Sequence, residues 1–104
     1  DQSEKEAFFR NILVLLKEYS QLNKNFSSDT IKNISAITDP VKMVYAVAGH
    51  FSFKTAANQS LLETPSISER LTQLIELIKQ EIIILLMVHL LTQAISIGQL
   101  KTIY

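Results

Sequence analysis

The side chains that most often carry chemistry in proteins are few in this chain and do not form clusters. It has two histidines, His50 and His89, far apart in the sequence, and no cysteine. A zinc site needs several ligands at short spacing or on one helix face, and neither histidine has such neighbours. We interpret His50 as a residue at a helix end and His89 as a hydrogen-bonded or interfacial residue on a helix face.

Other patterns of catalysis and cofactor binding are missing as well. The two glycines, Gly49 and Gly98, are too few to build a phosphate-binding loop. No serine lies in a strand-to-helix elbow or beside a paired histidine, and no two acids are placed to share a proton. The sequence therefore predicts no catalytic, cofactor-binding or metal-binding residues, and we expect no enzyme activity from this chain itself.

Length and charge narrow the remaining classes. The 104 residues suit one domain, and ten basic side chains balance ten acidic ones, so that the net charge is zero. Such a chain has no electrostatic attraction to nucleic acid or to an anionic membrane surface. The absence of cysteine favours a reducing compartment. The chain does not begin with methionine, which indicates a piece of a longer protein or a processed product.

The uncharged stretch from Ile82 to Leu100 is the strongest candidate for a contact surface. Its length approaches that of a membrane span, but the polar residues in its second half favour a helix buried against a partner or a second copy. An independent scaffold protein and a membrane anchor remain alternatives. The candidate protein-contact residues are those on the outward face of this helix: Ile83, Ile84, Met87, Leu90 and Leu91.

One long helix, over residues 66–97, must position these residues. Ser66 or Ser68 can cap its start, and Glu69 lies three residues after Ser66. Gly98 is a natural stop before a tail over 98–104. Apolar residues recur at helical spacing along the face that we expect to be buried. They are Ile67, Leu71, Leu74, Ile75, Ile78, Ile82, Leu85 and Leu86.

The residues before it, 1–65, read as short helices. We expect a first helix over 3–23, a short one over 29–35, and a third that begins at Asp39-Pro40 and ends near Gly49. A brief helix from Thr55 brings the count to about five, without a convincing strand. The third helix is predicted to bury Val41, Val44, Tyr45, Val47 and Ala48. The fold class is therefore all-α: a small bundle that ends in one long C-terminal helix.

Four segments carry a pattern through their order and spacing. The first two are Glu18-Tyr19-Ser20-Gln21-Leu22-Asn23-Lys24 and Ser35-Ala36-Ile37-Thr38-Asp39-Pro40, the latter followed by Val44 to Phe51. The next two are Lys54 through Gln59-Ser60-Leu61-Leu62-Glu63, and Glu69-Arg70-Leu71 continuing through Leu74-Ile75 to Glu81-Ile82. Together they cover about three quarters of the chain. In this order they resemble the helical part of the N-terminal, substrate-binding region of Lon, the ATP-dependent protease.

The resemblance implies a non-catalytic module for substrate recognition and subunit assembly. The parent would be a homo-oligomeric serine protease that uses ATP and magnesium, with its Ser–Lys dyad outside these residues. Its partners would be unfolded or damaged proteins, in the cytoplasm or, alternatively, the mitochondrial matrix.

The chain departs from the family pattern at two places. Ser52 stands where the family often has proline. After Leu85 the family continues with a highly charged helix, which this chain replaces with apolar residues. A divergent homologue, an engineered chain and an altered reading frame all fit this second change.

Overall fold

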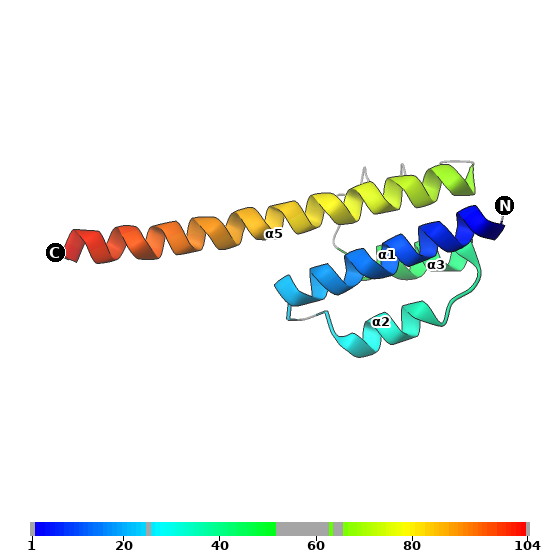
Figure 1. Ribbon diagram of the computed structural model, residues 1–104, viewed down its shortest axis with the longest axis horizontal. Coiled ribbons are helices and arrows are strands. Elements are labelled where there is room, and N and C mark those ends of the chain that lie inside the picture. The colour runs from blue at the N-terminus through cyan, green and yellow to red at the C-terminus, as the bar shows by residue number, and fades with distance from the viewer. Residues whose placement is uncertain (1, 25, 52–62, 64–65, 104) are drawn as a thin grey trace.

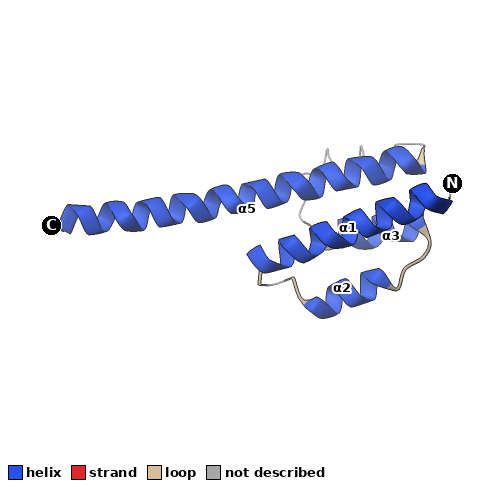
Figure 2. Ribbon diagram, viewed as in Figure 1, coloured by secondary structure: helices blue, strands red, loops and turns tan. Residues whose placement is uncertain are grey.

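The computed structural model describes residues 2–24, 26–51, 63 and 66–103. These residues form four helices and no strand: α1 (Gln2–Leu22), α2 (Ser28–Ser35), α3 (Pro40–Gly49) and α5 (Ile67–Ile103). The predicted all-helical class and the long C-terminal helix are confirmed (Figure 2). About five helices were expected, and the brief one predicted from Thr55 lies outside the described residues.

The helices form a small bundle from which one helix projects. The first part of α5 lies along α1, α3 packs against α5, and α2 lies next to α1 (Figure 1). The second part of α5 continues beyond the other helices to the C-terminal end. The molecule is therefore elongated, with principal dimensions of 61 × 28 × 21 Å.

Local capping sets where the short helices begin. Asp39 is the N-cap of α3, its carboxylate Oδ1 accepts from the Val41 N–H at 2.9 Å, and Pro40 occupies the first turn, as the sequence predicts. Ser27 caps α2, where its Oγ accepts from the Thr30 N–H at 3.2 Å. These side chains satisfy backbone donors that have no partner within the helix.

The core forms where α1, α2, α3 and the first part of α5 meet. From α5 it receives Leu71, Leu74, Ile75, Ile78 and Ile82. From the other helices and their connections it receives Ile12, Leu15, Leu16, Tyr19, Phe26, Ile34, Met43, Val44, Val47 and Phe51. All these side chains are at most 8% exposed, so the bundle has one continuous apolar interior.

Three residues expected in the core are exposed instead. Val41 and Tyr45 lie on the outer side of α3, while Met43 is fully buried in their place. Leu86 is 44% exposed, and it follows Ile82, the last buried residue of α5. Helical spacing alone cannot fix these positions, since the width of a buried stripe depends on the neighbouring helices.

The long helix also ends later than predicted. It begins at Ile67 and runs through Gly98 to Ile103, so the expected end at Ile97 and the expected tail over 98–104 do not match the observed helix. Gly98 does not adopt a positive φ, which a glycine stop would use. A glycine inside a helix costs only about 1 kcal/mol relative to alanine, and the helix tolerates it.

Candidate functional site

The five predicted contact residues all lie exposed on α5. They are between 51% and 66% exposed, and they follow Ile82, the last buried residue of α5. The set is Ile83, Ile84, Met87, Leu90 and Leu91. Large apolar side chains this exposed, and gathered on one segment, form a surface that is unusual on a monomer.

The same surface extends further along α5 than the predicted set. Val88, Ile95 and Ile97 are 54%, 61% and 55% exposed. Val88 follows Ile84 by four residues, Ile95 follows Leu91 by four, and Ile97 follows Leu90 by seven, so all three continue helical spacing that was visible in the sequence. We call the exposed apolar residues of α5 between Ile83 and Ile97 the distal face.

The distal face does not continue the side of α5 that contacts the bundle. In a helix, positions seven residues apart lie almost above one another, with a drift of about 20°. Two such rows on the bundle side begin with buried or partly buried apolar residues and end with exposed polar ones. They are Leu71, Ile78, Leu85 and Thr92, and Ile75, Ile82, His89 and Ser96.

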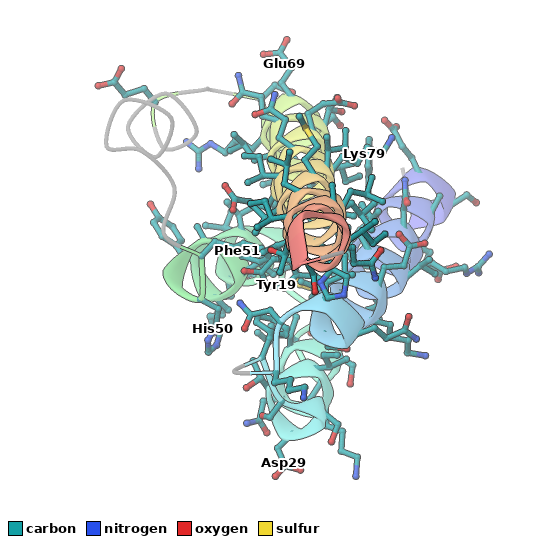
Figure 3. The ribbon with its side chains drawn as sticks, turned by 90° about the vertical axis from the view of Figure 1, so that its left-hand side faces the viewer. Tyr19, Asp29, His50, Phe51, Glu69 and Lys79 are labelled. Carbon is teal, nitrogen blue, oxygen red and sulfur yellow. The ribbon has the colours of Figure 1, made fainter. Side chains whose placement is uncertain are left out.

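On the opposite side of α5 the order is reversed. There a row at the same spacing begins with exposed acids and ends with exposed apolar residues. It consists of Glu69, Glu76, Ile83, Leu90 and Ile97. Glu69 and Lys79 point away from the buried Tyr19 and Phe51 (Figure 3). The apolar side of α5 therefore switches near Ile82–Ile83, and the distal face looks away from the bundle.

The two histidines lie at different places in the structure. His89 is exposed. It continues the row of Ile75 and Ile82, but no other described helix packs against α5 beside it. His50 is the C-cap of α3, and its ring meets that of Phe26 edge-on at 5.9 Å. His50 thus lies at a helix end, as the sequence predicts.

An aromatic cluster fixes the end of the bundle from which α5 emerges. The Tyr19 ring packs edge-on against Phe26, at 5.3 Å between ring centroids. It packs at a tilt against Phe51, at 4.6 Å. The Asn23 side-chain amide donates a hydrogen bond to the Tyr19 hydroxyl oxygen at 2.9 Å. These contacts hold the α1–α2 corner to the end of α3, below the point where α5 leaves the bundle.

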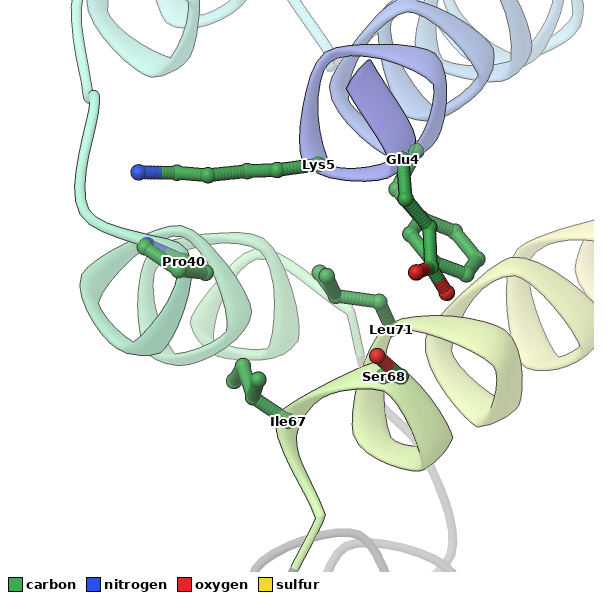
Figure 4. Close-up of a pocket in the computed structure, with 7 residues that line it drawn as sticks. Glu4, Lys5, Pro40, Ile67, Ser68 and Leu71 are labelled. Carbon is green, nitrogen blue, oxygen red and sulfur yellow. The ribbon is translucent and has the colours of Figure 1, made fainter. Parts of the chain in front are cut away.

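A pocket of about 210 Å³ lies at the other end, where α1, α3 and α5 begin (Figure 4). It is lined by Glu4, Lys5, Phe8, Pro40, Ile67, Ser68 and Leu71. The Glu4 and Lys5 side chains point in different directions. Glu4 is also exposed, so water screens its charge, and the lining offers no nucleophile paired with a base.

The described residues hold no group of three histidine, cysteine or acidic side chains that could bind a metal ion. No buried side-chain nitrogen or oxygen among them lacks a hydrogen-bond partner. No membrane-spanning helix is identified in this part of the chain. The distal face is accordingly the surface that we take as the candidate site.

Comparison with known proteins places this architecture in a family. Residues 1–80 match the family model of the ATP-dependent protease La (LON) substrate-binding domain. The match stops just before the switch in α5, so the distal face lies beyond it.

Individual relatives agree with the family model. The chain is 39% identical over 82 residues to a Lon protease of Halothermothrix orenii and 31% identical over 82 residues to that of Escherichia coli. It is 34% identical over 80 residues to Lon protease 1 of Myxococcus xanthus. These alignments cover 77–79% of the chain but only 10% of each relative, so the chain spans about a tenth of their length. The chain belongs to the family of the Lon substrate-binding domain.

Proposed function

We propose that this chain is the non-catalytic substrate-recognition and assembly module of a Lon-like ATP-dependent protease. The observation that carries this proposal is the combination of a family match over residues 1–80 with a bare apolar face directly after it. The bundle supplies a rigid base, and α5 carries the distal face away from it. Protein contacts through Ile83, Ile84, Met87, Leu90 and Leu91 would serve both roles.

The chemistry of the distal face suits unfolded or damaged proteins as partners. Such chains expose apolar side chains that a folded protein buries, and contact with the distal face removes apolar area of both partners from water. Met87 is flexible and polarisable, so it adapts to differently shaped side chains. The face carries no charge that would demand a particular charged sequence.

The catalytic parts belong elsewhere in this proposal. ATP, magnesium and the peptide-cleaving residues would act in other parts of a homo-oligomeric parent protein, which we place in the cytoplasm or, alternatively, in the mitochondrial matrix. An antibody against this chain, used on an extract of the source cells, gives a direct check. A band many times larger than 11.8 kDa is expected. A band at 11.8 kDa would contradict a parent protease and favour an independent scaffold.

Binding of an unfolded protein tests the recognition role. The probe is reduced and carboxymethylated lactalbumin, which stays unfolded, compared with the native form of the same protein by fluorescence anisotropy. We expect the chain to bind only the unfolded form. The double variant Ile84→Lys and Met87→Lys should weaken binding by at least about tenfold, because a loss of about 1.4 kcal/mol corresponds to that factor.

The matched control carries the same two added charges on the polar side of the same helix segment. Thr92→Lys with Ser96→Lys should leave binding nearly unchanged, since both residues lie on the rows that face away from the distal face. Equal binding by the two double variants would contradict the proposed contact surface.

A further inference from the structure

We propose that the distal face pairs with the distal face of a second copy of this chain, as two antiparallel α5 helices. This inference rests on the assembly role proposed above and names the partner of that role. It concerns the part of α5 beyond the family match.

The spacing of the distal face is that of a helix-to-helix seam. Its central residues follow one another at alternating steps of four and three: Ile83, Met87, Leu90, Ala94 and Ile97. Such a repeat keeps one side of a helix against a partner helix, where each side chain fits between side chains of that partner. From Ile83 to Ile97 the seam rises about 21 Å at 1.5 Å per residue.

Charge favours an identical partner. No residue from Ile82 to Leu100 is formally charged, so two copies brought together along this stretch create no like-charge contact. A charged partner would instead lose hydration without gaining an opposite charge. The surface that best matches an uncharged apolar helix face here is that face itself.

The acids at the beginning of α5 decide the relative direction. Glu69 and Glu76 lie on the same row as Ile83 and Leu90, so a parallel pair would place each acid opposite its own copy. In an antiparallel pair only the distal segments of the two helices overlap, and the two bundles lie at opposite ends of the pair. The helix dipoles then also oppose each other favourably. In the antiparallel register that keeps Glu69 and Glu76 outside the overlap, Met87 of one copy lies opposite Ile97 of the second copy.

Disulfide trapping can read both the pairing and its direction, because the chain has no cysteine of its own. A Met87→Cys variant is mixed with an Ile97→Cys variant that carries a short mass tag, and the mixture is oxidised. Positions 87 and 97 are about 15 Å apart along the helix, whereas a disulfide needs Cα atoms within about 7 Å. An antiparallel pair therefore gives the mixed product, and a parallel pair gives like-with-like products.

The control and the size measurement use the same chain. Thr92→Cys, on the row opposite the seam, should not form a linked product under the same conditions. In sedimentation the unmodified chain should run at twice 11.8 kDa, and Leu90→Lys should return it to the monomer mass. Ser96→Lys should leave the pair intact.

Three results would overturn the inference. They are like-with-like disulfides, a chain that stays monomeric at all accessible concentrations, and a monomer that floats with phosphatidylcholine vesicles. If the chain is monomeric but still binds unfolded lactalbumin through Ile84 and Met87, the recognition role stands and the pairing fails. If the mixed disulfide forms and no unfolded protein binds, the pairing stands and the recognition role fails.

Discussion

The two halves of α5 share one helix and have opposite surroundings. In the half that lies on the bundle, the apolar residues face α1 and α3, and the acids face water. In the distal half the polar residues continue the bundle side, and the apolar ones face outward. The first half is stabilised by apolar contacts with the bundle, while the second half presents only polar side chains on that side.

This contrast shows that the hydrophobic pattern of a helix carries information beyond its length. A continuous 37-residue helix with one apolar side would indicate a single binding partner along its whole length. A helix whose apolar side switches indicates two partners on opposite sides. The bundle of the same chain is the first, and the distal face is open to the second.

The largest expected effect is a difference in the free energy of unfolding between substitutions in the two halves of α5. Ile78→Ala removes a fully buried side chain of the first half and should lower the free energy of unfolding by about 2–5 kcal/mol. Leu90→Ala, in the distal half, should change it by no more than about 0.5 kcal/mol when the chain is monomeric. Urea unfolding followed by circular dichroism measures both. Similar losses for the two variants would show that the distal half is part of the folded core.

A smaller effect is expected at the start of α5. The Glu69 N–H donates a hydrogen bond to the Ser66 Oγ at 3.4 Å, which caps the covered end of the helix. Ser66→Ala should cost about 0.5–1 kcal/mol in the same unfolding experiment. Thr92→Ala removes an exposed hydroxyl of the distal half, which bonds back to the Val88 carbonyl, and should leave bundle stability unchanged. An equal loss in both variants would argue against a local cap.

The smallest effect concerns the charged side of the first half. The Lys79 ammonium lies 3.9 Å from a Glu76 carboxylate oxygen, and both side chains are about half exposed or more. Water screens such a pair, so Glu76→Ala should change the free energy of unfolding by less than about 0.5 kcal/mol. A loss above 1 kcal/mol in thermal or urea unfolding would mean that this side of α5 is not simply solvated.

Sequence reasoning succeeded where the structure depends on local chemistry. Asp39 and Pro40 mark the start of α3 through a cap and a fixed φ, and neither depends on distant residues. The buried row of α5 also follows from its spacing, because Leu71, Ile75 and Ile78 recur on one face of that helix.

Burial could not be predicted from the sequence where it depends on the positions of neighbouring helices. Tyr45 and Leu86 have helical spacing suited to burial, but α3 and α5 meet their neighbours on other sides. Gly98 was expected to end α5 because glycine commonly does so, yet no following turn competes with the helix there. At the candidate site, the five predicted residues are exposed, and their role in protein contacts stays a prediction. The prediction left out Val88, Ile95 and Ile97, which are exposed on the same segment.

Amide hydrogen exchange along α5 of the 104-residue chain tests the central claim most directly. At concentrations where the chain is monomeric, amides of residues 71–82 should exchange only through global unfolding, because packing holds them. Amides of residues 86–98 should exchange far faster, since a helix without packing is marginal in water, and should become protected as the concentration rises. Equal protection of both halves in the monomer would contradict the division of α5 into a covered half and a bare one.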